Sequence, residues 1–302
     1  MLEPFGERQI ISASRRTDIP AFYPGWLAAR LEAGSVLVPS PYGAEPRRVS
    51  LAPGDVYGLV LWSKNHAPLL PFLDRIQARC PNLFFHFTIT GLPRVLEPGV
   101  PDWLDAARTL MDLAGRFSPE HLVWRFDPIC ALDGHGLDRV EEVFRALART
   151  LEGYARRCVV SFVQDYAKAR RNLARAGVVL TPLTDQEQAD FAARLAGIGR
   201  EHGLTLSSCC HPVAREGGLA PARCVDGPLL ARLWGQPLLA GLKAGATRPE
   251  CGCGRSLDIG AYGTCGHGCL YCYATADHQA GAKTARRQDD QSPSQGTPLQ
   301  ND

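Results

Sequence analysis

The stretch YGLVLWSKNHAPLLPFLDRIQAR (residues 57–79) contains the structural unit that the rest of the chain repeats in outline. An apolar run of strand length at 57–62 leads into the polar residues SKN at 63–65, and a segment with helical spacing follows at 66–79. A buried strand, a polar turn and a helix in this order are typical of a βα unit in a parallel sheet.

The same alternation of strand and helix patterns runs along most of the chain. It predicts strands at 9–13, 57–62, 83–89, 121–126, 158–163, 204–209 and 257–261, and helices at 22–33, 66–79, 102–117, 137–151, 186–202 and 228–234. The insert at 35–51 is rich in Pro and Gly and indicates a hairpin or an ordered loop. Around seven strands with crossover helices predict an α/β protein, specifically an incomplete TIM-like (β/α) barrel.

Composition excludes several classes of protein. The chain has 302 residues with 33 Lys and Arg against 31 Asp and Glu, a formal charge of +2, which excludes a strongly basic nucleic-acid coat protein and an acidic tail protein. No apolar run approaches a membrane span, and the first residues lack a secretion-signal pattern, so we expect a cytoplasmic protein without a membrane partner. We expect the polar tail at 285–302 to be disordered.

The strongest local signal is the loop Cys265-Gly-His-Gly-Cys269-Leu-Tyr-Cys272. Three closely spaced thiolates with glycines between them can enclose a 4Fe-4S cluster and leave one iron open for a small molecule. A structural zinc site is the alternative, and it would need His267 or a distant cysteine as its fourth ligand.

This loop, with Tyr271 before its last cysteine, resembles the cluster motif of the radical S-adenosylmethionine (SAM) superfamily. The string CGHGCLYCYA (265–274) is similar to the spore-photoproduct-lyase-like branch of that superfamily. The whole chain also resembles an uncharacterised family of domains of unknown function that carry such a cluster near the carboxyl end. In the superfamily the motif normally follows the first barrel strand, whereas here it begins at Cys265 of 302 residues.

Further segments resemble the lyase-like branch in chain order. They are SRRTDIP (14–20), the Ser63-Lys64 pair before a helix, the Thr- and Glu-Pro-bearing stretch 85–110, and VWRFDPI (123–129). We therefore predict a circular permutation in which the first βα unit has moved to the carboxyl end. The barrel body would span 1–255, including a cysteine-containing segment at 205–255, and a strand, loop and helix at 256–284 would complete it.

The resemblance implies a cofactor set and a reaction. Cys265, Cys269 and Cys272 would hold a 4Fe-4S cluster, and SAM bound to it would be cleaved to a 5′-deoxyadenosyl radical that acts on an unknown substrate. A donor such as flavodoxin or ferredoxin would supply the electron. The residues implied to contact SAM are Thr17 and Asp18 at its ammonium group, Tyr271 near its adenine, and Lys64, Thr88 and Glu97 at its ribose or carboxylate.

A second cysteine group precedes the loop. Cys210, Cys224, Cys251 and Cys253, with Cys209 beside them, are enough donors for a second iron-sulfur cluster or a zinc site. Packing as small buried side chains is the alternative for each of these cysteines, and it is what we expect for Cys80, Cys130 and Cys158. Cys130 is also a candidate hydrogen-atom donor.

Two other classes of function stay open. One is a non-catalytic iron-sulfur or zinc protein on a barrel scaffold. The other is an enzyme that repairs or modifies nucleic-acid bases, for which the paired arginines, such as Arg15-Arg16 and Arg170-Arg171, would bind phosphates. The chain has no P-loop, dinucleotide-binding, serine-hydrolase or zincin motif.

Overall fold

A computed structural model describes residues 8–40, 45–132, 136–245 and 248–275. The chain divides into two compact units. Unit 1 comprises Met1–Phe85, Ser256–Gly268 and Ala274–Asp302, and unit 2 comprises His86–Arg255 and Cys269–Tyr273. The end of the helix expected within 256–284, and the tail expected at 285–302, lie outside the described residues.

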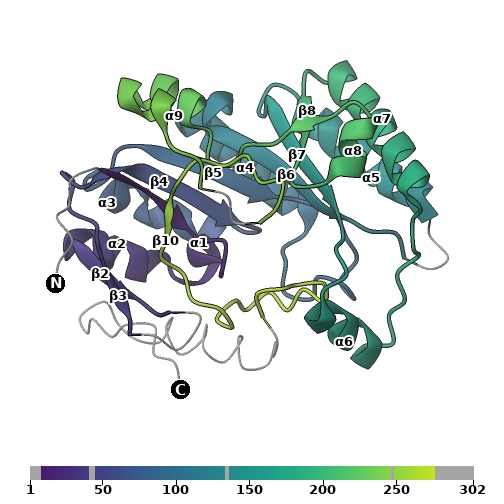
Figure 1. Cartoon of the computed structure of the whole chain (residues 1–302), viewed down its shortest axis with the longest axis horizontal. Coiled ribbons are helices and arrows are strands. Elements are labelled where there is room, and N and C mark those ends of the chain that lie inside the picture. Colours follow the sequence, from purple (N-terminus) through teal and green to yellow (C-terminus); the bar gives the residue numbers. More distant parts are fainter. Residues whose placement is uncertain (1–7, 41–44, 133–135, 246–247, 276–302) are drawn as a thin grey trace. The chain divides into compact units, whose positions relative to one another are not determined.

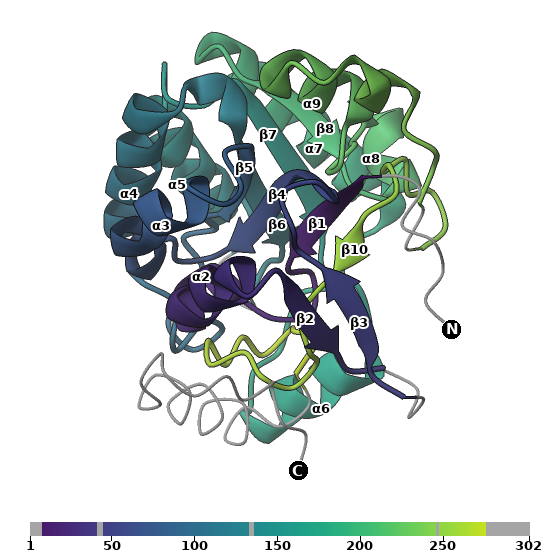
Figure 2. The ribbon, with the colours of Figure 1, turned by 90° about the vertical axis from the view of Figure 1, so that its left-hand side faces the viewer.

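Unit 1 carries the first and the last of the described strands. Its elements are β1 (Gln9–Ala13), α1 (Ile19–Phe22), α2 (Pro24–Glu32), β2 (Ser35–Val38), β3 (Arg47–Ser50), β4 (Val56–Ser63), η1 (Ala67–Phe72), α3 (Leu73–Gln77), the first half of β5 (Leu83–Thr88) and β10 (Leu257–Asp258). The insert at 35–51 is a hairpin, as one of its two predicted forms requires, with β2 antiparallel to β3 (Figure 2).

The last strand of unit 1 pairs with the first. β10 lies parallel to β1, with Ile11 opposite Leu257 and Ser12 opposite Asp258, and β4 pairs in parallel with the other side of β1 (Figure 1). This is the adjacency that the permutation hypothesis requires. In β4 every residue from Gly58 to Ser63 is buried, as expected for a parallel strand covered on both faces.

Unit 2 continues the pattern of parallel strands joined by helices. Its elements are the second half of β5, α4 (Trp103–Arg116), η2 (Pro119–His121), β6 (Leu122–Ile129), α5 (Gly136–Thr150), β7 (Arg157–Phe162), α6 (Ala167–Arg175), α7 (Asp185–Glu201), β8 (Thr205–Ser208), α8 (Pro212–Glu216), β9 (Ala220–Pro221), α9 (Gly227–Trp234) and η3 (Pro237–Gly241). β7 lies between β6 and β8, and both pairings are parallel.

The described strands confirm the expected α/β class, but they do not show the expected incomplete TIM-like barrel. Their order is β10-β1-β4-β5-β6-β7-β8-β9, an open parallel sheet with β10 and β9 as its end strands. Each of these end strands is only two residues long. Alternating strands and helices occur in both open and closed α/β sheets, and closure depends on strand tilt and stagger, which the sequence pattern does not reveal.

None of the helices in the described part of the chain has the length and apolar character needed to cross a bilayer.

An aromatic cluster forms part of the core of unit 2. The Phe144 ring on α5 stacks on Trp124 with centroids 5.0 Å apart, and it meets Phe126 edge-on at the same distance. All three side chains are at most 2% exposed. Burial on this scale, together with aromatic contacts, makes Phe144 a principal contributor to the stability of unit 2.

We expect Phe144→Ala to lower the free energy of unfolding of unit 2 by about 3–5 kcal/mol, because it leaves a cavity under α5. Urea denaturation followed by circular dichroism measures this change. Leu104→Ala is the control, since Leu104 is 44% exposed on α4 and its truncation should cost little. Equal losses for the two variants would contradict the assigned core.

Candidate functional site

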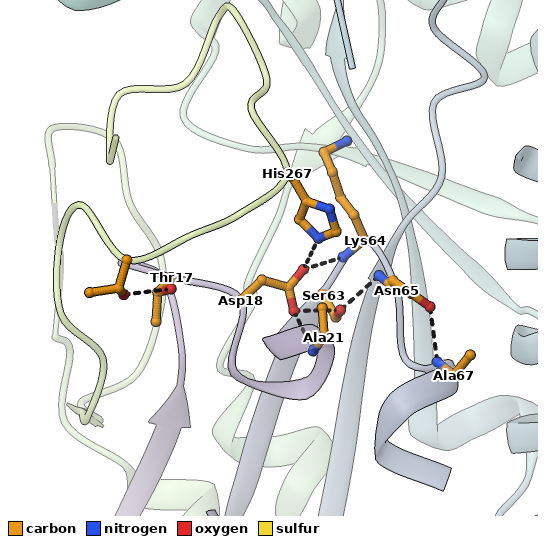
Figure 3. Close-up of polar contacts among 9 residues, drawn as sticks. Thr17, Asp18, Ala21, Ser63, Lys64, Asn65, Ala67 and His267 are labelled. Carbon is orange, nitrogen blue, oxygen red and sulfur yellow. Dashed lines mark hydrogen bonds and ion pairs between the residues drawn. The ribbon is translucent and has the colours of Figure 1, made fainter. Parts of the chain in front are cut away.

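The carboxylate of Asp18 is the centre of a buried polar cluster in unit 1. Its Oδ1 accepts hydrogen bonds from the Ala21 backbone N–H at 3.0 Å and from Ser63 Oγ at 2.6 Å. Its Oδ2 accepts from the Lys64 backbone N–H at 2.8 Å and lies 2.8 Å from His267 Nε2 (Figure 3). Asp18 thus caps the N-terminus of α1 and also binds the end of β4 and the cysteine loop.

The surroundings of Asp18 favour its charged form. Burial disfavours the carboxylate, but the hydrogen bond and charge of His267, with the bonds from Ser63 and Lys64, outweigh this cost and hold the pKa of Asp18 below its usual value. An ionised carboxylate only accepts hydrogen bonds, so His267 Nε2 carries the proton of the bond that joins them. Since Asp18 is 6% exposed and His267 3%, this contact is shielded from solvent.

Three further contacts hold the part of the cysteine loop that belongs to unit 1. Thr264 Oγ1 donates to Thr17 Oγ1 at 2.9 Å, and Tyr23 Oη donates to the Thr264 carbonyl. The His267 ring meets the ring of Phe22 edge-on, with centroids 4.7 Å apart. Cys265 therefore lies between two positions of the loop that are fixed to residues around α1.

A second carboxylate ties β10 to the turn after β1. Asp258 accepts from Ser12 Oγ at 2.9 Å, Ser14 Oγ at 2.7 Å and the Arg15 N–H at 2.7 Å. A side chain at Gly260 would collide with this network, because a Cβ there would lie 2.0 Å from Ser14 Oγ. These bonds fix the strand that leads into the cysteine loop.

The cysteine loop itself is divided between the two units. Cys265 belongs to unit 1 and is half-buried, whereas Cys269 (buried) and Cys272 (half-buried) belong to unit 2. In unit 2 the Cys272 N–H donates to the Cys269 carbonyl at 3.0 Å, and the Leu270 N–H donates to the Leu96 carbonyl at 3.0 Å. Each part of the loop is thus held by its own unit.

Tyr271 has a protein partner within unit 2. Its hydroxyl donates to Glu97, which also accepts from Thr90 Oγ1 at 2.9 Å. Burial is the largest of the effects that raise the pKa of Tyr271 well above its usual value, and the nearby charge of Cys269 acts in the same direction. Thr88, another predicted SAM contact, lies buried at the end of β5 in unit 2.

The structure thus brings together Thr17, Asp18, Lys64 and Cys265 in unit 1, and Tyr271 with Glu97 in unit 2. Within the described ranges, no set of three or more His, Cys, Asp or Glu side chains already surrounds a metal position. The implied contacts with SAM stay predictions. Asp18 has two protein partners on each oxygen, so its observed role is to position the loop.

Sequence reasoning missed two parts of this site. It considered His267 only as a possible zinc ligand and gave Asp258 no role. In the structure His267 is the buried partner of Asp18, and Asp258 binds the turn after β1. The only local signal for His267 was its place between Gly266 and Gly268 in the loop.

The family model described as "Domain of unknown function (DUF1848)" matches residues 10–274. The chain belongs to this family. No curated protein and no solved structure matches it. The DUF1848 match begins in β1 and ends just after the cysteine loop, so it includes both carboxylate clusters and all three loop cysteines.

We expect Asp18→Asn to lower the free energy of unfolding by about 1–3 kcal/mol at neutral pH, because an amide N–H₂ replaces one of two buried acceptors. The depressed pKa of Asp18 adds stability above its unfolded value, and this stability is lost as the pH falls through the folded value. The difference in the free energy of unfolding between wild type and variant should therefore become smaller at acidic pH. Denaturation curves at several pH values measure it.

Asp105→Asn is the matched control, since the side chain of Asp105 lies on the exposed face of α4 in an ion pair with Arg108. A loss for Asp18→Asn no larger than for this control, or a difference that does not change with pH, would contradict the assigned role of Asp18.

Proposed function

We propose that this DUF1848 protein is an iron-sulfur protein of radical SAM type, with Cys265, Cys269 and Cys272 as the cluster ligands. The observation that carries the proposal is the three-thiol loop itself: three cysteines within eight residues, with glycines on both sides of His267. Thiolates are the usual ligands of 4Fe-4S clusters, and three of them leave one iron for SAM.

The donors in the loop fit such a cluster. Two glycines allow the backbone to approach an inorganic cluster closely, and Gly268 has the positive φ of 70° that favours glycine. Zinc would require a fourth ligand, and His267, whose Nε2 donates to Asp18, could supply only its Nδ1. When bound, the cluster would pass one electron from a donor such as flavodoxin or ferredoxin to SAM on its open iron, which would give methionine and a 5′-deoxyadenosyl radical.

The residues of unit 1 would orient the loop. Asp18 accepts a hydrogen bond from Nε2–H of His267 and so fixes the chain two residues after Cys265. On the other side of Cys265, the Tyr23 hydroxyl donates to the Thr264 carbonyl. Pre-positioned ligands lose less conformational entropy on binding a cofactor. In unit 2 the Leu270 N–H and the Tyr271 hydroxyl do the same for the second half of the loop.

The proposed function predicts that anaerobically reconstituted protein binds about four irons per chain and, with dithionite and SAM, releases 5′-deoxyadenosine. Cys269→Ala should lose the iron absorbance and the product while the fold is kept. Cys80→Ala is the matched control, because Cys80 is buried in unit 1 outside the loop and should leave both unchanged.

Other outcomes discriminate among the alternatives. A protein that takes up only zinc at the loop contradicts the proposal. Iron without SAM binding in calorimetry would identify a non-catalytic iron-sulfur protein. If the protein is active, binding to DNA or RNA that weakens steeply with salt would identify a nucleic-acid substrate.

A further inference from the structure

Unit 2 contains a second group of thiols, formed by five cysteines outside the loop. We call it the thiol group; its members are Cys209, Cys210, Cys224, Cys251 and Cys253. Cys209 Sγ lies 4.0 Å from Cys210 Sγ. Side-chain hydrogen bonds also join Cys224 to Cys209 and to Cys253, and Cys251 to Cys253. The five thiols thus form a series of neighbouring pairs, which does not yet surround a metal position.

Backbone hydrogen bonds hold the segments that carry these thiols. The Cys209 N–H, just after β8, donates to the Val160 carbonyl at 3.0 Å. The Cys224 carbonyl lies 2.7 Å from Nε2 of the buried His86 on β5, and the Cys224 N–H points at Cys253 Sγ at 3.3 Å. The fold of unit 2 therefore brings together thiols that are up to 44 positions apart in the sequence (253 − 209).

Two features indicate that the group does more than fill space. Arg248 donates to Cys209 Sγ at 3.2 Å, and Arg125, whose side chain is 15% exposed, is a second cation near Cys209. Cations placed at sulfur atoms favour thiolates, which bind metals, over neutral thiols. In addition, the described non-glycine residues with positive φ are Cys210 (50°) and Glu250 (64°), one in the group and one beside Cys251. Such backbone strain is common at ligand sites.

We propose that four of these five thiols hold one zinc ion. Sulfurs bound to tetrahedral zinc at about 2.3 Å lie about 3.8 Å apart, close to the observed contact of Cys209 with Cys210. Cysteine sulfurs that touch one another can bind one zinc ion together. The cysteine sulfurs of a four-iron cluster each bind a different iron and therefore lie farther apart. The ion would replace the thiol–thiol hydrogen bonds and release the thiol protons to solvent. Its four thiolates leave a net charge of −2, which Arg248 offsets in part together with Arg125, a residue that is also paired with Asp127.

The test measures this site separately from the cysteine loop. In the full-length variant Cys265→Ala/Cys269→Ala/Cys272→Ala, which lacks the loop donors, we expect about one zinc per chain by elemental analysis. Adding Cys224→Ala should remove this zinc. Adding Cys158→Ala instead should not, since Cys158 is an equally buried cysteine of unit 2 outside the group. Replacement of zinc by cobalt should give the absorption of a tetrahedral cobalt thiolate.

A second measurement does not depend on a variant that folds. The half-buried thiols of Cys210 and Cys251 should react with iodoacetamide in the native protein faster after a zinc chelator is added. No zinc in the triple variant, zinc that survives Cys224→Ala, iron in place of zinc, or alkylation that the chelator does not change would each overturn the proposal. A loop that fails to bind iron would leave this result unaffected.

Discussion

The ionised carboxylate of Asp18 is the constraint on which unit 1 depends. It joins chain segments that are 45 and 249 positions away from it, at Ser63 and His267. A buried charge is costly unless hydrogen bonds replace its lost water, and here both oxygens have two partners each. The end of β4, the start of α1 and the cysteine loop must therefore be in place together, because each one satisfies part of the same charge.

The sequence predicted local elements well and long-range geometry poorly. The bounds of β1, β4 and β5 were predicted to within one residue, because a buried parallel strand is a continuous apolar run. The helix expected at 22–33 is instead interrupted at Tyr23, where Pro24 begins α2. α6 was missed because its sequence AKARRNLAR has little apolar pattern, and only Ala169 and Asn172 are buried in it.

Within the site, residue types could be predicted, but their partners could not. Asp18, Lys64 and the loop cysteines were found because polar residues after strands and closely spaced thiols are local signals. The partnership of His267 with Asp18 depends on the pairing of β10 with β1, which no local pattern encodes. Cys209 was placed beside the second group only by proximity in the sequence, whereas the fold places it next to Cys224.

The pairing of β10 with β1 also has a consequence for how the protein is made. Asp258 and its partner Ser12 are 246 positions apart, so at about 5–20 residues per second a ribosome needs about 12–50 s to synthesise the stretch between them. Throughout that time the nascent β1 has one edge without its native neighbour, and such edges are prone to pair with other chains. β1 therefore leaves the ribosome long before β10, the strand that completes its pairing.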